Sequence, residues 1–96
     1  MKLLWSAKAA SDRKRAIQFI ADKNVGAAIG QLDEIERQTD FLIDQPEIGR
    51  PGRIDGTREL VISRTSLIVI YRVRQKLKQV EILRLVHGAQ KWPPKS

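Results

Sequence analysis

Cysteine is absent from this chain of 96 residues, and histidine occurs once. Without cysteine, neither a disulfide nor a thiolate zinc site can form, and one histidine cannot build a histidine-rich metal site. The chain is also too short for an enzyme that needs a deep pocket and a separate cofactor lobe. We therefore expect no metal and no cofactor, and the lack of cysteine fits a reducing compartment.

Long hydrophobic runs are missing too. The longest purely apolar run, Leu67–Tyr71, is far shorter than the roughly 20 residues that span a membrane. Near the start of the chain, Ser6 and Lys8 interrupt the apolar residues before they reach the length of a secretory signal. We expect a cytoplasmic protein that makes no membrane contact.

What the chain does have is an ordinary globular composition. Hydrophobic residues make up 42% and charged residues 30%, which predicts one folded domain over residues 1–96. The net charge of +7 is divided unevenly: residues 1–49 hold seven Lys and Arg against eight acids, whereas residues 50–96 hold eleven against three. The basic half is therefore expected to present a surface for a polyanion or for an acidic protein.

Apolar periodicity predicts a strand and two helices in the first half. Lys2–Trp5 suits a short strand, and Ser6 suits the N-cap of a helix that runs to about Asp22. From Val25, apolar residues recur at the spacing of an amphipathic helix until Pro46 ends it. Because the connection between the helices is so short, we expect an antiparallel hairpin.

The second half is expected to form an irregular loop and three strands. Prolines and glycines crowd residues 45–56, a density typical of an ordered but irregular loop. Segments rich in Val, Ile and Leu predict strands at Thr57–Ser63, Ser66–Arg74 and Gln79–His87. The predicted fold class is α+β: an N-terminal strand, an antiparallel helix hairpin, and a three-stranded β-meander that completes a mostly antiparallel four-stranded sheet.

Apolar residues alternate on both faces of the predicted sheet. One face must pack on the helix hairpin, and the other still carries the apolar set Ile68, Ile70, Leu83 and Leu85, or the residues that alternate with them. A single helix pair cannot cover both faces of a small antiparallel sheet. We therefore expect a partner protein to bind this second face.

The order of elements and their local sequences resemble the RelE/ParE superfamily of toxins from type II toxin–antitoxin systems. The resemblance rests on KLLWS at 2–6 with Ala9, PEIGRPG at 46–52, GTRELV at 56–61, IVIYRV at 68–73 and ILRLVHGAQKW at 82–92. It implies a small basic toxin held inactive by a cognate antitoxin, which agrees with the uncovered apolar set. Binding to operator DNA is then expected only through the antitoxin.

The resemblance implies two possible targets. RelE-like members cut mRNA on the ribosome, using basic side chains and a general acid or base, whereas ParE-like members poison DNA gyrase. Arg58 matches a basic position of the nucleases, and His87 matches a histidine shared by some nucleases and many other members. However, Ile68, Gly88 and Ala89 replace the arginine and tyrosine side chains that nucleases carry. His87 and Arg58 are the catalytic residues only if the chain cleaves mRNA.

The residues expected to bind the target are four arginines and one tryptophan: Arg58, Arg72, Arg74, Arg84 and Trp92. Each has a plainer interpretation. The arginines can be solvated charges with Glu59 and Glu81 as cross-strand partners. His87 can cap its strand, and Trp92 can be an anchor that holds the tail on the domain.

Inhibition of DNA gyrase by a non-enzymatic toxin, neutralised by a cognate antitoxin, is the preferred interpretation. Ribosome-dependent cleavage of mRNA is the second hypothesis, with the ribosome and its message as partners. The third is a degenerate member that persists as a nucleic-acid-binding module. These hypotheses differ in whether expression stops growth, and in whether DNA or protein synthesis fails first.

Overall fold

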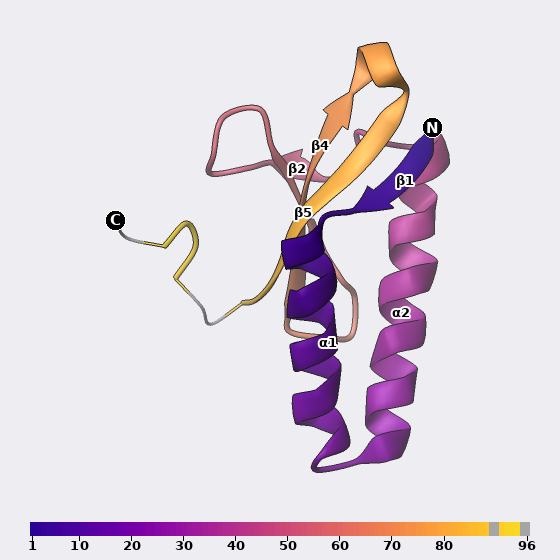
Figure 1. Ribbon diagram of the computed structural model, residues 1–96, viewed down its shortest axis with the longest axis vertical. Coiled ribbons are helices and arrows are strands. Elements are labelled where there is room, and N and C mark those ends of the chain that lie inside the picture. Colours follow the sequence, from indigo (N-terminus) through magenta and orange to yellow (C-terminus); the bar gives the residue numbers. More distant parts are fainter. Residues whose placement is uncertain (89–90, 95–96) are drawn as a thin grey trace.

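The computed structural model describes residues 1–88 and 91–94. Its elements follow in the order β1 (Lys2–Trp5), α1 (Ala7–Ala21), α2 (Val25–Asp44), β2 (Arg50–Pro51), β3 (Arg58–Val61), β4 (Leu67–Arg74), the 3₁₀ turn η1 (Gln75–Leu77) and β5 (Gln79–His87). Helices α1 and α2 form a hairpin that extends past one end of the sheet (Figure 1). The α+β class predicted from the sequence is confirmed. Within the described residues, no helix has the length and apolar character needed to cross a membrane.

Both helices begin at a side-chain cap. Ser6 Oγ accepts a hydrogen bond from the Ala9 amide at 3.0 Å, and Asn24 Oδ1 accepts one from the Ala27 amide at 2.9 Å. Caps of this kind stabilise a helix by about 1 kcal/mol each. The cap predicted at Ser6 is confirmed, and Asn24, in the short connection between the helices, caps α2.

The sheet has five strands in the order β1-β5-β4-β3-β2. Strand β1 is parallel to β5, and the other neighbours are antiparallel. The predicted four-stranded sheet was thus one strand short, because β2 arises inside the loop rich in proline and glycine. It pairs Arg50 with Glu59 and Pro51 with Arg58. Proline has no amide hydrogen to donate, so β2 can lie only at an edge of the sheet.

The hydrophobic core lies between the hairpin and one face of the sheet. Ile35 and Leu42 of α2 and Val69, Tyr71 and Val80 of the sheet are all fully buried in it. Full burial of an aliphatic or aromatic side chain contributes about 1.5–3 kcal/mol. The apolar side chains predicted for the second helix therefore form most of the helical side of this core.

Tyr71 also fixes the loop that leaves α2. Its hydroxyl donates to the Pro46 carbonyl at 2.7 Å and accepts from the Gly49 amide at 2.9 Å. A Cβ atom at Gly49 would lie 2.6 Å from that hydroxyl oxygen, so only glycine fits there. Burial of the phenol raises the pKa of Tyr71 above its usual range.

Strand β5 contains a β-bulge that changes which side chains share a face. Tyr71 pairs with Ile82 and Ile70 pairs with Arg84, which leaves Leu83 as the extra residue. Beyond the bulge the alternation is reversed, and Leu85 joins the hydrophobic core on the hairpin side. The prediction that Ile68, Ile70, Leu83 and Leu85 share one face is therefore wrong.

Candidate functional site

The face of the sheet away from the hairpin, which we call the open face, carries the remaining apolar residues. Alternation along the strands and cross-strand pairing place Glu59, Ile68, Ile70, Arg72 and Val86 on it. Val86 pairs with Ile68 and takes the place on this face that the prediction gave to Leu85. The open face therefore has a narrow apolar centre with charged residues beside it.

Trp92 covers the apolar centre of the open face. Ile70 and Val86 are buried and Ile68 is half-buried, and all three line one small hollow together with Trp92. Arg53 Nη1 holds the segment by donating to the Trp92 carbonyl at 2.8 Å. This placement fits the anchor interpretation of Trp92. Its indole Nε1 is buried and has no hydrogen-bond partner within residues 1–88 and 91–94.

A buried carboxylate organises the arginines at the β2 edge of the open face. Glu59 is 2% exposed, and it accepts hydrogen bonds from Arg50 Nη2 at 3.0 Å and from the Arg53 amide at 3.1 Å. Burial alone raises the pKa of Glu59, but the two hydrogen bonds and the nearby positive charges outweigh burial and lower it. Arg50 and Arg53 were not among the residues predicted to bind a target.

A second carboxylate holds the arginines of β4. Glu81 accepts from Arg72 Nε at 2.7 Å and from Arg74 Nε at 3.4 Å. The hydrogen bond from Arg72 is the main cause that lowers the pKa of Glu81. Glu81 is thus the cross-strand partner that the plainer interpretation expected. Both arginine side chains nevertheless keep 41% of their surface exposed and can contact another molecule.

Arg58 lies on the other side of the sheet from Arg72. It pairs with the core residue Tyr71, and its Nη1 donates to the Gly49 carbonyl at 2.8 Å and to the Glu47 carbonyl at 3.3 Å. Arg58 therefore stabilises the loop after α2. The expectation that it forms one surface with the arginines of β4 is wrong, because residues of opposite parity point to opposite faces.

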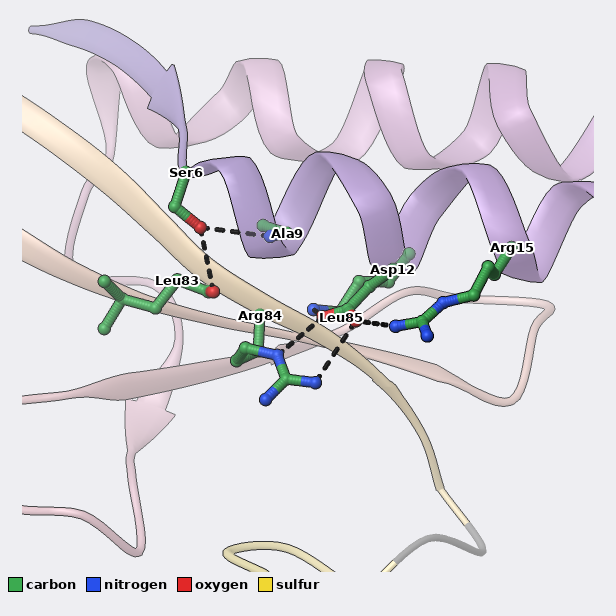
Figure 2. A network of polar contacts seen from close by, with 7 residues as sticks. All are labelled: Ser6, Ala9, Asp12, Arg15, Leu83, Arg84 and Leu85. Atoms are coloured by element: carbon green, nitrogen blue, oxygen red, sulfur yellow. Dashed lines mark hydrogen bonds and ion pairs between the residues drawn. The ribbon is translucent and has the colours of Figure 1, made fainter.

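Helix α1 replaces a strand along part of β5. Strand β1 ends at Trp5, opposite Ile82, so no strand within residues 1–88 and 91–94 pairs with the rest of β5 on that edge. The Ser6 amide donates to the Ile82 carbonyl at 2.9 Å, and Ser6 Oγ donates to the Leu83 carbonyl at 3.0 Å (Figure 2). The start of α1 thereby satisfies the backbone at the bulge.

Asp12, further along α1, continues this connection (Figure 2). Its carboxylate accepts from Arg84 Nε at 2.7 Å and Nη2 at 3.2 Å, from the Leu85 amide at 3.0 Å, and from Arg15 Nη2 at 3.0 Å. Burial raises the pKa of Asp12, but these hydrogen bonds prevail and hold it below its ordinary value. Arg84 is thus committed to Asp12, and its guanidinium also lies 5.6 Å from the ring centre of Trp92.

The two residues named as catalytic candidates do not converge. Along β4, His87 pairs with Leu67 and Arg58 pairs with Tyr71. These partners are four positions apart, or about 13 Å at the usual rise of about 3.3 Å per residue. His87 is exposed at the end of its strand.

Two positions where nucleases carry reactive side chains lie just after His87. The Gly88 amide donates to the Ser66 carbonyl at 2.6 Å, and a Cβ atom at Gly88 would lie 3.2 Å from that oxygen. Ala89 lies outside the described residues. The part of the chain that the structure describes contains no group of three or more His, Cys, Asp or Glu that could hold a metal ion.

Comparison with known proteins shows the family of the chain. A family model described as the ParE toxin of the type II toxin–antitoxin system parDE matches residues 3–92. The chain belongs to this ParE toxin family. It is also 34% identical over 92 residues to "Putative toxin Y4kP" of Sinorhizobium fredii, covering 96% of this chain and 93% of that protein. The resemblance to RelE/ParE toxins is confirmed.

Solved structures show the same fold. A structure of the chromosomal ParDE system from P. aeruginosa aligns with a TM-score of 0.78 and 27% identity, covering 91% of this ParE-family chain and 95% of that chain. The E. coli RelBE toxin–antitoxin complex aligns with a TM-score of 0.65 and 12% identity, covering 94% and 98%. At that identity the RelBE likeness shows the fold alone.

Proposed function

We propose that this ParE-family toxin stops growth by inhibiting DNA gyrase, through binding rather than catalysis. The observation that carries the proposal is the separation of Arg58 from His87. The guanidinium of Arg58 donates to a carbonyl group of the loop after α2. On β4, the residue that pairs with Arg58 lies four positions from the residue that pairs with His87. Cleavage of a phosphodiester needs acid–base and phosphate-binding groups at the same reacting atoms. Membership of the ParE family supports the same choice.

The open face supplies the contact surface in this proposal. Arg72 and Arg74 are partly exposed beside Glu81, and Arg50 and Arg53 flank Glu59 at the β2 edge of the sheet. The glutamates hold the arginines in fixed positions, so an acidic target meets an ordered positive surface. Such complementarity increases association rates and selects the partner. Trp92 lies beside Arg53 and Arg84 and is a candidate for the same contact.

A cognate antitoxin neutralises the toxin in this proposal. The solved relatives include a ParDE system and a complex of RelE with its antitoxin. Of the residues predicted to bind the antitoxin, Ile68 and Ile70 lie on the open face, Leu83 lies at the bulge, and Leu85 lies on the hairpin side. Ile70 and Leu85 are buried, so Ile68 and Leu83 are the partly exposed members of this set that an antitoxin can contact.

Induced expression tests the target directly. DNA synthesis and protein synthesis are measured by pulse labelling after induction, and purified chain is added to a gyrase supercoiling assay. Early loss of DNA synthesis with inhibited supercoiling supports the proposal, and His87→Ala serves as a control that should behave like the wild type. Early loss of protein synthesis, with ribosome-dependent mRNA cleavage abolished by His87→Ala, would assign the chain to the mRNA interferases. Nucleic-acid binding without growth arrest would indicate a degenerate module.

A further inference from the structure

The helix hairpin has a second side, which faces away from the sheet and carries Val25 and Ile29. We call it the outer hairpin face. The buried residues of α2, among them Ala28, Ile35 and Leu42, point toward the sheet. Val25 and Ile29 lie one turn apart outside that buried stripe, and they keep 63% and 58% of their surface exposed. Two neighbouring aliphatic side chains with this exposure form an apolar patch that a partner can cover.

A groove between α1 and α2 continues this apolar patch. Its volume is about 270 Å³, and it is lined by Arg13, Lys14, Ile17, Gln18 and Ala21 of α1 and by Leu32 of α2. Leu32 follows Val25 at i+7 and Ile29 at i+3, so these three residues share one stripe of α2. The patch and the groove together give the outer hairpin face an apolar centre.

The two helices of the hairpin carry opposite charges. Helix α1 has four basic residues and one acid, whereas α2 has five acids and one basic residue. The acid of α1, Asp12, is 7% exposed and is bound by Arg84 of the sheet. The exposed charges of α1 are therefore positive, and those of α2 are mainly negative. Figure 1 shows the two helices side by side, so both signs of charge meet in one face.

The exposed acids of α2 form a row. Asp33, Glu36 and Asp40 recur at i, i+3 and i+7, and all three are exposed. Within residues 1–88 and 91–94, none of these acids takes part in an ion pair, and no ion pair joins α1 to α2. Lys14 of α1 is likewise exposed and outside the ion pairs of these residues. Charges of both signs therefore remain available to a second molecule.

Gly30 marks a place where another backbone can approach α2. It is exposed in the interior of the helix, where glycine is less favourable than every other residue except proline. A Cβ atom at Gly30 would meet nothing within 4 Å, so packing inside the described chain does not require glycine there. Gly26 lies one turn earlier on the same side of α2. Without side chains, these two positions let another helix lie close to the backbone.

We infer that the outer hairpin face binds a second copy of this chain, so that two hairpins form a four-helix bundle. A two-fold axis parallel to the helices places α1 of each copy on α2 of the other, and thus positive charge on negative charge. A two-fold axis across the helices would instead place like charges together. In the favoured arrangement all neighbouring helices are antiparallel, which is an ordinary geometry for a four-helix bundle.

Positions along the hairpin give the contacts of this dimer. The connection at residues 22–24 puts the end of α1 beside the start of α2, so each step back along α1 matches one step forward along α2. Ile17 of one copy then meets Ile29 of the other, and Lys14 comes within reach of Asp33. Symmetry makes each contact twice.

Charge also decides which occupant suits the outer hairpin face. Each copy carries a net charge of +7, but residues 50–96 hold eleven Lys and Arg against three acids, and they form most of the sheet. Two copies that meet through their hairpins therefore meet through their least positive parts. Nucleic acid suits this face poorly, because the acids of α2 repel phosphates. The open face of each copy stays free in this dimer, because it lies on the other side of the sheet.

The size of the face predicts a weak, reversible dimer. Helix α2 has 20 residues and is therefore about 30 Å long, and two packed helices are about 20 Å wide. The contact then buries roughly 600 Å² on each copy, or about 1,200 Å² in total, which is the lower end for specific interfaces. We expect a dimer Kd of about 1–100 µM at about 0.15 M salt.

Charge reversal tests the contact between Lys14 and Asp33 in the full chain. Lys14→Glu and Asp33→Lys each place like charges together twice, so each should raise the dimer Kd in sedimentation equilibrium by about tenfold or more. In an equimolar mixture of the two variants, a heterodimer again joins opposite charges at both contacts. Its Kd should return to within about threefold of the wild type. Lys76→Glu and Asp55→Lys, which make the same charge changes at exposed positions outside the hairpin, are the controls and should stay within about threefold, alone or mixed.

Gly30→Gln tests the close approach without a change of charge. Glutamine favours a helix and the space beside Gly30 is open, so this variant should melt at or above the wild-type temperature. Its side chain would nevertheless block the second helix, and the dimer Kd should rise by about tenfold or more. Circular dichroism confirms that every variant folds.

Three results would overturn the inference. The first is a wild-type chain that remains monomeric at about 1 mM. The second is a dimer whose Kd changes with neither charge reversal, because such a dimer would use another surface. The third is a pair of reversals that each weaken the dimer but do not restore it when mixed, because α1 of one copy would then not contact α2 of the other.

Discussion

Replacement of Asp12 by alanine removes the carboxylate that joins α1 to β5. The Leu85 amide would then be left at a buried position without an acceptor, which costs about 1–3 kcal/mol. The hydrogen bonds from Arg84 involve charged groups, worth about 1.5–3 kcal/mol, and the 28% exposure of that side chain puts its share at the low end. Arg15 is mostly exposed and adds little. We expect the free energy of unfolding to fall by about 3 kcal/mol.

The cost of Asp12→Ala should depend on pH in a defined direction. The folded-state pKa of Asp12 lies below the ordinary value of 3.8. Its ionised form therefore stabilises the folded state at any pH above that ordinary value, and the stabilisation is lost as the pH falls through the lower, folded-state pKa. The difference between wild type and Asp12→Ala should be largest near neutral pH and should shrink below about pH 4.

Urea unfolding followed by circular dichroism, at neutral and acidic pH, measures both effects. Asp40→Ala is the matched control, because Asp40 is an exposed aspartate on α2. Asp12→Asn keeps an oxygen for the Leu85 amide but offers an amide group in place of the charge, so its cost should be intermediate. The reasoning would be refuted by a loss for Asp12→Ala below about 1 kcal/mol, or by a loss that does not change with pH.

Three further variants test other parts of the structure. Tyr71→Phe removes a hydroxyl that binds one carbonyl and one amide of the loop after α2. Urea unfolding should show that the free energy of unfolding falls by about 1–3 kcal/mol. A change near zero would mean that water replaces the hydroxyl. Trp92→Ala uncovers Ile70, so binding of a hydrophobic dye should increase without loss of the fold; unchanged dye binding would show that Trp92 is no cover. The double variant Arg72→Glu/Arg74→Glu should change the urea midpoint no more than ordinary surface substitutions do. It should abolish growth arrest and remove the salt dependence of target binding. A double variant that is still toxic would show that these arginines are only solvated.

Local signals predicted the helices and the long strands. Ser6 is a good cap, Pro46 stops α2, and the apolar spacing from Val25 matches the buried stripe that contacts the sheet. Each of these signals acts within a few residues along the chain. Strand β2 carries no such signal, since two residues cannot show a period of two and one of them is Pro51.

The bulge in β5 could not be predicted from alternation alone. The sequence alternates from Gln79 to Ile82 and resumes at Arg84 after the extra apolar Leu83. However, adjacent apolar residues also occur in a regular strand with apolar residues on both faces, and no glycine marks the irregularity. The reason for the bulge lies outside the strand: β1 ends at Trp5, and Ser6 then binds the Leu83 carbonyl. One shifted residue sends Leu85 to the core and Val86 to the open face. The predicted apolar set was wrong for this reason.

Charge counting located the basic half but did not locate a basic face. Arg58 and Arg72 lie on strands that pair through the same sheet, yet their positions in the register put them on opposite sides. Arg84 leaves the open face to bind a helix, and Arg50 comes to that face from the edge strand β2. Net charge limits the class of partner, whereas the position of each arginine depends on pairing that only the folded sheet sets.

The sequence does hold one signal for the buried acid. Ala9, Asp12 and Ala16 recur at i, i+3 and i+7, so all three share one face of α1. Ala9 is fully buried, and an aspartate in such a stripe of small residues must find a positive partner or hydrogen-bond donors. Its partner, Arg84, lies 72 positions further along the chain. The stripe therefore predicts that Asp12 is paired, but choosing Arg84 among the basic residues requires knowing that α1 runs beside the part of β5 that β1 leaves unpaired.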